Sequence, residues 1–288
     1  MATVRAAFLL QKIISVFQTT RNVSRHRAFT LLELLIVISI LAVLSGLIFV
    51  GVSQGFKAAA KAQDVSLARD LTTGFRATAA EGNGNYLPGY DRRVDEVILK
   101  NGRVVTGPTA NRYPFRLARE MESTVDEVAL VGQVRKQIDS SNDYTVSLYP
   151  ALGINHYFVG GDVQADGSIS HAPDCVTRID QGLASIIVFA TAGSLRDNGE
   201  VINGYNTLTP PFLTTRMWET EPWAQGANPM DYGHLDARHG RKVVASFLDG
   251  SVRSLEVEEM RDMRLWSVKA AMKNDPNYKI RRARRGRL

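Results

Sequence analysis

The amino-acid sequence predicts an α+β protein in which a long N-terminal helix packs, through its second half, on an antiparallel β-sheet. Three observations predict this fold class. Residues 34–52 form an apolar run without a charged side chain, residues 56–79 carry an amphipathic helical pattern, and the rest of the chain alternates short β-prone segments with turn residues. A chain of 288 residues is long enough to bury a sizeable core beside such a helix.

The apolar run has the length of a membrane span. Its nineteen uncharged residues rise about 28 Å as a helix, close to the thickness of the bilayer hydrocarbon. A secretory signal has a shorter apolar region followed by an A-x-A site, and a core helix carries polar residues every third or fourth position. The run shows neither pattern. Arg21, Arg25 and Arg27 precede it, so the positive-inside rule predicts a cytoplasmic N-terminus and places the later residues across the membrane.

One carboxylate, Glu33, stands at the start of the run. An acid in a membrane helix costs about 2.5–3.5 kcal/mol at the helix centre, and such residues are kept for a purpose. Glu33 is therefore a functional-site candidate that needs an opposite charge nearby.

The helix is predicted to continue beyond the span, from about residue 30 to residue 80. Apolar residues recur at helical spacing without an intervening proline: Phe56, Ala60, Leu67, Ala68, Leu71, Phe75 and Ala79. The stretch EGNGNYLPGY at 81–90 ends the helix with glycines and a proline. The apolar face of this second half of the helix must pack against a globular domain.

Short β-prone segments follow the helix. The predicted strands are Val94–Leu99, Tyr144–Leu148, Ile154–Val159, Ala184–Ala190, Lys242–Leu248 and Val252–Val257. Asp249-Gly250 predicts a tight hairpin turn between the last two. We also expect a helix at Phe115–Met121, a long loop at Gly193–Arg238 and a short helix within residues 256–274.

The net charge of +6 is confined to the two ends of the sequence. Residues 1–28 hold five Lys/Arg and residues 279–288 hold six, without an acid in either segment, whereas the 250 residues between hold 24 Lys/Arg against 29 Asp/Glu. These 250 central residues are mildly acidic, so the charge of the chain does not favour a nucleic-acid partner. The basic tail is predicted to be solvated, with nucleic acid and anionic lipid as alternatives.

The segment RAFTLLELLIVISILAVLSGL resembles the N-terminal signal of type IV pilins and type II secretion pseudopilins. The resemblance implies cleavage by a prepilin peptidase between Ala28 and Phe29, N-methylation of Phe29, and a role in filament assembly for Glu33, whose carboxylate would face the N-terminus of a neighbouring subunit. The residue before the cut is Ala28, where the family usually has glycine, and the implied leader is long.

A second resemblance lies near the other end of the chain. RHGRKVVASFLDGSV places nine residues between His239 and Asp249-Gly250, as in the H-x9-D-G motif of many bacterial pilin-like proteins. Two interpretations remain open for this motif. His239 and Asp249 form a binding or catalytic pair, or His239 bonds the hairpin while Asp249-Gly250 makes its turn; the sequence favours the second.

The resemblance divides the chain into five parts and gives it a pilin-like α+β fold. They are a leader at 1–28, a transmembrane and filament-core helix at 29–52, an amphipathic continuation at 53–80, a periplasmic globular domain at 81–278 and a basic tail at 279–288.

Candidate metal ligands fall in two clusters. GHLDARH brings together His234, Asp236 and His239, for which clustering of polar residues is an equal explanation. GGDVQADGSISHAPD carries Asp162, Asp166 and Asp174, without the spacing of an EF-hand. No cofactor is predicted, although the resemblance leaves Ca²⁺ open. Cys175 is the single cysteine of the chain, which excludes an intrachain disulfide and favours a small buried side chain.

The sequence predicts a structural subunit rather than an enzyme, since it carries none of the common nucleotide-binding, hydrolase or metalloprotease motifs. The resemblance implies a subunit of a type IV pilus or type II secretion pseudopilus in the inner membrane. Its partners would be the prepilin peptidase, further subunits of a filament, the assembly machinery and the lipid bilayer. Two alternatives stay open: a minor or tip subunit that binds a secreted substrate or DNA, and a membrane-anchored periplasmic domain that never polymerises.

Overall fold

A single long helix, α2 (Leu31–Glu81), forms the N-terminal part of the described structure. The computed structural model describes residues 30–121, 130–169, 174–213 and 216–280. The chain divides into two units, of which the first ends at Ser53 and the second begins at Gln54. The predicted leader and residues 281–288 of the predicted basic tail lie outside the described residues.

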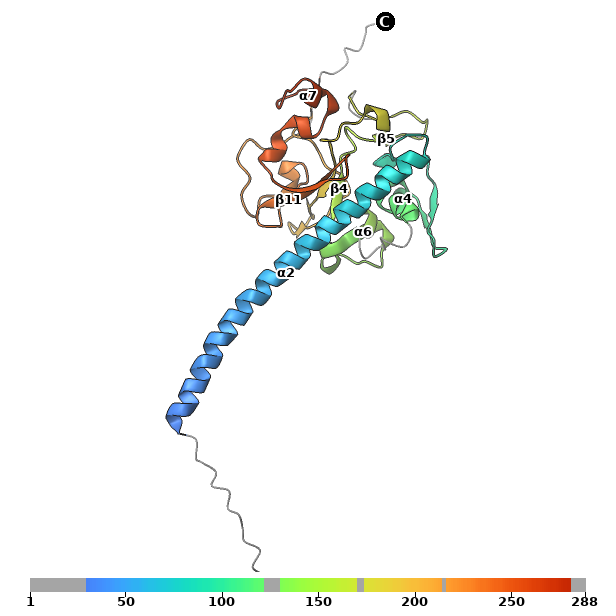
Figure 1. Ribbon diagram of the computed structural model, residues 1–288. Coiled ribbons are helices and arrows are strands. Elements are labelled where there is room, and N and C mark those ends of the chain that lie inside the picture. Colours follow the sequence, from blue (N-terminus) through green and yellow to red (C-terminus); the bar gives the residue numbers. More distant parts are fainter. Residues whose placement is uncertain (1–29, 122–129, 170–173, 214–215, 281–288) are drawn as a thin grey trace, which may run out of the picture. The chain divides into compact units, whose positions relative to one another are not determined.

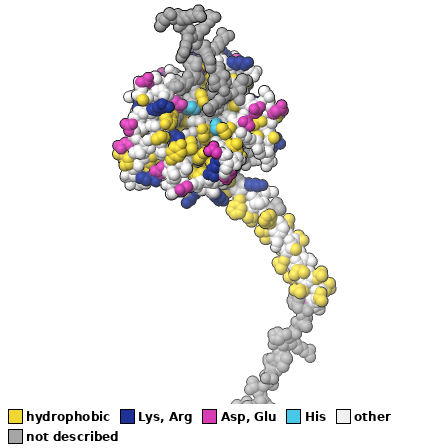
Figure 2. All heavy atoms as spheres, turned by 180° about the vertical axis from the view of Figure 1, so that it is seen from behind, with side chains coloured by type: hydrophobic (Ala, Val, Ile, Leu, Met, Phe, Trp, Pro, Cys, Tyr) yellow, Lys and Arg dark blue, Asp and Glu magenta, His cyan; other side chains and the backbone are white. Residues whose placement is uncertain are grey.

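The first unit contains the apolar part of α2. Its large apolar side chains are exposed, from 43% at Val37 to 81% at Leu31, and Figure 2 shows many of them along the face of the helix in view. Within the described residues, α2 is the one helix long and apolar enough to cross a membrane. The predicted apolar helix is thus confirmed, and its exposed surface fits an anchor in lipid.

The second unit is an α+β body. Besides α2 its described helices are α3 (Pro108–Asn111), α4 (Tyr113–Glu120), α6 (Asp143–Leu148) and α7 (Val268–Met272), with 3-10 turns η1 (Gly132–Lys136), η2 (Ile179–Gln181), η3 (Pro229–Tyr232), η4 (Glu259–Arg261) and η5 (Met263–Leu265). Its strands are β1 (Tyr90–Asp91), β2 (Glu96–Ile98), β3 (Val104–Thr106), β4 (Leu152–Ile154), β5 (Asp162–Val163), β6 (Ile187–Thr191), β7 (Ser194–Leu195), β8 (Val201–Ile202), β9 (Phe212–Leu213), β10 (Arg216–Met217), β11 (Lys242–Phe247) and β12 (Val252–Glu256).

The main sheet has four strands in the order β12-β11-β6-β4, and every neighbouring pair is antiparallel. The remaining strands form short two-stranded pairs around it. Side chains of β11 alternate between two cores: Val244 packs on the side of α2, whereas Val243 and Ala245 pack on the opposite side with Trp266. Both faces of the central strands are therefore covered.

The second half of α2 packs across this sheet (Figure 1). Its buried residues follow the predicted stripe: Leu67, Ala68, Leu71, Phe75 and Ala79. Phe75 stacks on Tyr86 with ring centroids 5.2 Å apart and meets Phe189 of β6 edge-on at 5.8 Å. The predicted pairing of helix and antiparallel sheet is confirmed, except that Phe56 at the start of the stripe is 73% exposed.

Residues 144–148 form helix α6, so the predicted strand there is wrong. Asn142 caps the helix, and its side-chain oxygen accepts hydrogen bonds from the backbone N–H groups of Tyr144 at 3.0 Å and Thr145 at 3.4 Å. This cap satisfies backbone donors at the helix start and outweighs the β propensity of the tyrosine, threonine and valine that follow.

The predicted strand Ile154–Val159 is also wrong beyond its first residue. Strand β4 ends at Ile154, and the backbone N–H of Val159 donates to the carbonyl of Asn155 at 3.0 Å. The buried Asn155 side chain donates to the carbonyl of Ile187 at 3.0 Å and so fixes this turn against β6. A buried amide needs such partners, and they are found in a turn here rather than in a ladder.

The other predicted elements are confirmed in outline. Helix α4 lies at the predicted helix, β2, β6, β11 and β12 lie at predicted strands, and Gly193–Arg238 is mostly irregular with the short pairs β7–β8 and β9–β10. The predicted short C-terminal helix is α7, preceded by two 3-10 turns.

Candidate functional site

Glu33 closes a hydrogen-bonded ring with Thr30 at the start of α2. One carboxylate oxygen, Oε2, accepts from the backbone N–H and from the hydroxyl of Thr30, both at 2.9 Å, and Thr30 Oγ1 accepts from the Glu33 N–H at 3.2 Å. This reciprocal arrangement is a capping box, which satisfies N–H groups that the first helical turn otherwise leaves without partners. The acid therefore has partners within its own chain.

The other two residues of the predicted processing site, Ala28 and Phe29, lie outside the described residues. The pairing of Glu33 with the N-terminus of a neighbouring subunit accordingly stays a prediction. The capping box adds a feature that the sequence interpretation missed, although T-L-L-E at residues 30–33 has its spacing.

His239, the first residue of the H-x9-D-G pattern, contacts helix α2. Its Nε2 atom lies 2.6 Å from Oδ2 of Asp64, and the His239 side chain is 5% exposed. The His239 side chain therefore bonds helix α2 and not the hairpin, because the acceptor belongs to α2. The His239 backbone forms the local hydrogen bonds: its N–H donates to the Lys242 carbonyl at 3.4 Å, and the Lys242 N–H donates to the His239 carbonyl at 3.3 Å.

Asp64 is fully buried and also pairs with an arginine. Nε of Arg238 lies 2.8 Å from the same Oδ2 atom of Asp64, and Nη1 of Arg238 lies 2.9 Å from Oδ2 of Asp236. Burial by itself would raise the pKa of Asp64, but the positive charge of Arg238 and the hydrogen bonds from His239 and Arg238 outweigh burial and hold that pKa below its usual value. The carboxylate stays ionised inside the body.

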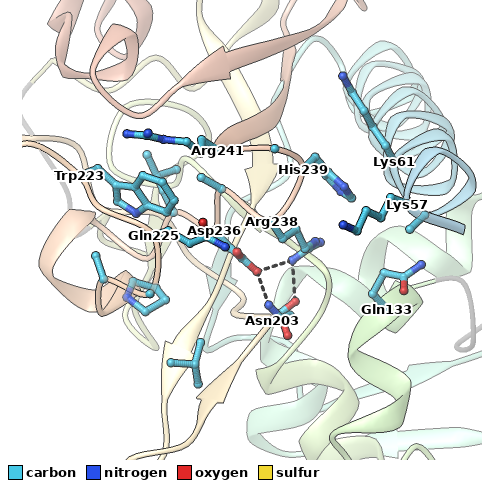
Figure 3. Close-up of a pocket in the computed structure, with 18 of the residues that line it drawn as sticks. Lys57, Lys61, Gln133, Asn203, Trp223, Gln225, Asp236, Arg238, His239 and Arg241 are labelled. Carbon is cyan, nitrogen blue, oxygen red and sulfur yellow. Dashed lines mark hydrogen bonds and ion pairs between the residues drawn. The ribbon is translucent and has the colours of Figure 1, made fainter. Parts of the chain in front are cut away.

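Arg238 holds several segments together through its remaining donors. Nη2 donates to the carbonyl of Ala151 at 3.0 Å, and Nη1 donates to the carbonyls of Asn203 at 2.8 Å and Ala192 at 3.3 Å. Asn203 in turn donates from Nδ2 to Asp236 at 2.8 Å (Figure 3). A guanidinium with five N–H donors is suited to such a junction.

The second end of the pattern makes the hairpin turn and contacts α2 again. Asp249 Oδ1 accepts from the Ser251 N–H at 2.8 Å, Gly250 has a left-handed φ of +89°, and the Phe247 N–H donates to the Ser251 carbonyl at 3.0 Å. This is a three-residue loop closed by glycine, and it is the tight hairpin turn predicted at Asp249-Gly250. Nη1 of Arg76 donates to the Asp249 carbonyl at 2.9 Å.

The H-x9-D-G pattern therefore fastens β11 along α2 at both ends. Asp64 and Arg76 are twelve positions apart on α2, about 18 Å by helical rise, and the six residues of β11 span about 20 Å. Between the two ends, Oγ1 of Thr72 donates to Oγ of Ser246 at 2.6 Å. The hairpin is thus joined to α2 at three points, by His239, Ser246 and Asp249.

Replacement of Gly250 by alanine is expected to destabilise the body by about 1–2 kcal/mol or more. A Cβ atom there would lie 2.9 Å from Nη1 of Arg76, in addition to the cost of the left-handed backbone. Gly102→Ala is the matched control, because Gly102 has a φ of +82° and a Cβ there meets no atom within 4 Å. Chemical denaturation of both variants checks this. Equal losses would mean that the Arg76 contact contributes nothing.

The candidate calcium ligands each have a separate partner. Asp162 Oδ2 lies 2.8 Å from Nδ1 of His156, Asp166 accepts from the Ser168 N–H at 2.9 Å, and Asp174 pairs with Lys269 and Tyr278. The carboxylates are thus engaged with different parts of the chain.

The residues of the second candidate metal cluster, His234, Asp236 and His239, also have separate partners. His234 is buried, its ring stacks on Tyr205 with centroids 3.9 Å apart, and Nδ1 lies 3.1 Å from the carbonyl of Gly193. Asp236 faces Arg238 and Asn203, and His239 faces Asp64. In the described part of the chain, no group of three or more His, Cys, Asp or Glu is arranged to hold a metal ion.

Cys175, for which the sequence favours a small buried side chain, is half-buried. Burial raises the pKa of its thiol, with a further contribution from the negative charge of Asp162, so the thiol stays protonated. A protonated thiol is a poor nucleophile.

The long helix α2 begins with a capped acid, exposes an apolar first half and packs on an antiparallel sheet with its second half. This α+β arrangement is consistent with a pilin-like fold, and the apolar half fits a membrane anchor. A family model described as the prokaryotic N-terminal methylation motif matches residues 23–49, which include Glu33 and most of the apolar run. The match supports a type IV pilin- or pseudopilin-like protein and points to a structural subunit rather than an enzyme. Searches of curated proteins and of solved structures found no match. The family model ends before His239, so the resemblance of residues 239–250 stays a prediction.

Proposed function

We propose that this chain is a structural subunit of a type IV pilus or type II secretion pseudopilus. Its leader is cut between Ala28 and Phe29, the new amine of Phe29 receives a methyl group, and the apolar helix holds the subunit in the inner membrane until it joins a filament. The body lies on the periplasmic side. The observation that carries the proposal is Glu33, a single acid at the head of an apolar helix, within the segment that matches the methylation motif.

The physical basis of assembly is charge pairing in lipid. A carboxylate among apolar helices is unfavourable unless an opposite charge meets it, and the methylated amine of Phe29 in a neighbouring subunit supplies that charge. Within the isolated chain Thr30 gives Glu33 hydrogen bonds but no positive charge. In a filament, the amine of Phe29 in a neighbouring subunit would supply this positive charge.

The test is the intact mass and N-terminal sequence of the protein from the native membrane fraction. We expect a chain that begins at N-methylated Phe29. A chain that retains residues 1–28, in cells with an active prepilin peptidase, would contradict the proposal and favour an anchored domain that never polymerises.

A minor or tip subunit that binds a secreted substrate or DNA is a second possibility for the same pathway. The long irregular segment Gly193–Arg238 favours it, because it adds surface to the body beyond the sheet. Filaments formed by the purified protein alone would argue against this role.

A further inference from the structure

A groove of about 930 Å³ opens on the body beside the start of its part of α2 (Figure 3). Lys57 and Lys61 of α2 lie on one side, and Trp223 and Arg241 lie on the other. Residues of η1, including Lys136, complete the lining. Arg238 and His239, which pair with the buried Asp64, also line the groove, so the groove is built on a fixed part of the body.

The groove collects positive charge. Four cations line it without a carboxylate partner among the described residues: Lys57, Lys61, Lys136 and Arg241. The acid on the lining, Asp236, is already engaged by Arg238 and Asn203. Lys57 and Lys61 are four residues apart on one helical face, where like charges repel. This arrangement is unfavourable unless an anion enters.

The turn that presents Arg241 carries backbone strain. Gly240 and Arg241 have φ values of +64° and +67°, and His239 exchanges backbone hydrogen bonds with Lys242 across them. Glycine or asparagine usually occupies such a position, and arginine there costs free energy. The conformation places the Arg241 guanidinium 5.9 Å from the centre of the Trp223 ring, above the groove. Strain of this kind concentrates at binding sites.

The position of the groove along the chain indicates its ligand. Lys57 follows the last residue of the apolar run, Val52, by five positions, about 8 Å of helix. The polar headgroup layer of a bilayer is about 5–8 Å thick on each side. Phe56, beside Lys57, is 73% exposed, and aromatic residues are enriched at the membrane surface. When the apolar run lies in lipid, Lys57 is at the depth of the phosphates.

We propose that the groove binds the phosphate headgroup of an anionic phospholipid. Lys57, Lys61 and Arg241 contact the phosphate, and Trp223 packs on the glycerol portion. The bound lipid would hold the body on the membrane surface in the waiting subunit and would have to be released when the subunit leaves the bilayer. The proposal rests on membrane insertion, as in the proposed function, but not on cleavage or assembly.

The experiment uses the full chain in zwitterionic detergent micelles, which cover the apolar helix. Short-chain phosphatidylglycerol, short-chain phosphatidylcholine and inorganic phosphate are titrated separately, and Trp223 fluorescence is followed with Trp223→Phe as the blank. We expect saturable binding of phosphatidylglycerol and little response to phosphatidylcholine. Replacing both lysines, Lys57→Gln and Lys61→Gln, should weaken binding roughly tenfold or more.

The matched control removes two positive charges elsewhere on the body. Arg69 and Arg92 are exposed and do not line the groove, so Arg69→Gln with Arg92→Gln should retain the affinity of the unaltered chain. Equal binding of the two lipids, or equal weakening in the control, would overturn the proposal. Inorganic phosphate that binds as tightly as the lipid would overturn it in favour of a free anion. A single-stranded oligonucleotide that displaces the lipid at lower concentration would overturn it in favour of nucleic acid. A failed cleavage assay would leave all these outcomes unaffected.

Discussion

Replacement of Arg238 by alanine is expected to lower the free energy of unfolding of the body by about 3–5 kcal/mol. The change removes the positive partner of two buried carboxylates, Asp64 and Asp236, and leaves the carbonyls of Ala151 and Asn203 without this donor. A buried ion pair adds little net stability over an apolar core, but removal of one partner leaves an uncompensated charge. Thermal or denaturant unfolding of the purified chain measures the loss.

Arg241→Ala is the matched control for this variant. Arg241 is three residues further along the chain, is exposed and has no carboxylate partner among the described residues. Its loss should change the free energy of unfolding by less than about 0.5 kcal/mol, as is usual for surface substitutions. If both variants unfold alike, the buried network does not stabilise the fold.

The pH dependence of unfolding provides a second readout for the Arg238 variant. Because the pKa of Asp64 is lower in the folded than in the unfolded chain, its contribution to stability is present above the unfolded pKa of about 3.9 and is lost as pH falls through the folded pKa. Without Arg238 the folded pKa of Asp64 should rise, since burial then acts with less opposition. The acid-induced loss of stability that Asp64 causes should therefore be smaller in the variant and should be complete at a higher pH.

Local periodicity was sufficient to predict the elements that carry their signal in consecutive residues. The apolar run and the stripe from Leu67 to Ala79 predict α2, because the 3.6-residue repeat determines which side chains face lipid or core. Asp249-Gly250 predicts the β11–β12 hairpin for a similar reason, since its turn chemistry is contained in a few residues. The strand at residues 144–148 failed where a single cap, Asn142, favoured a helix instead.

The contacts of the site could not be predicted, because they join residues far apart in sequence. Asp64 and His239 are 175 positions apart. The sequence did contain one sign of the contact: Asp64 occupies the same helical face as Ala60, Leu67 and Leu71, where a buried acid requires a cation. Asp162 and Asp174 show the converse: they are close in sequence, yet each pairs with a different side chain in the structure.

Replacement of Glu33 by leucine is expected to leave the subunit in the membrane and to exclude it from filaments. The apolar helix becomes more apolar, so insertion is unaffected or improved. The charge that would meet the amine of Phe29 in a neighbouring subunit is lost, and we expect incorporation to fall at least tenfold. The measurement is the fraction of subunit in sheared filaments against the fraction in membranes, in cells that also produce the unaltered protein.

Thr30→Ala separates the capping role of Glu33 from its charge. This variant removes the hydroxyl that donates to Glu33 at 2.9 Å and accepts from its N–H at 3.2 Å, but it keeps the backbone N–H donor and the carboxylate. Loss of the cap costs about 1 kcal/mol of local helix stability. If charge drives assembly, Thr30→Ala enters filaments nearly as well as the unaltered protein while Glu33→Gln fails as Glu33→Leu does. If Thr30→Ala fails as completely as Glu33→Leu, the helix start rather than the negative charge is what assembly requires.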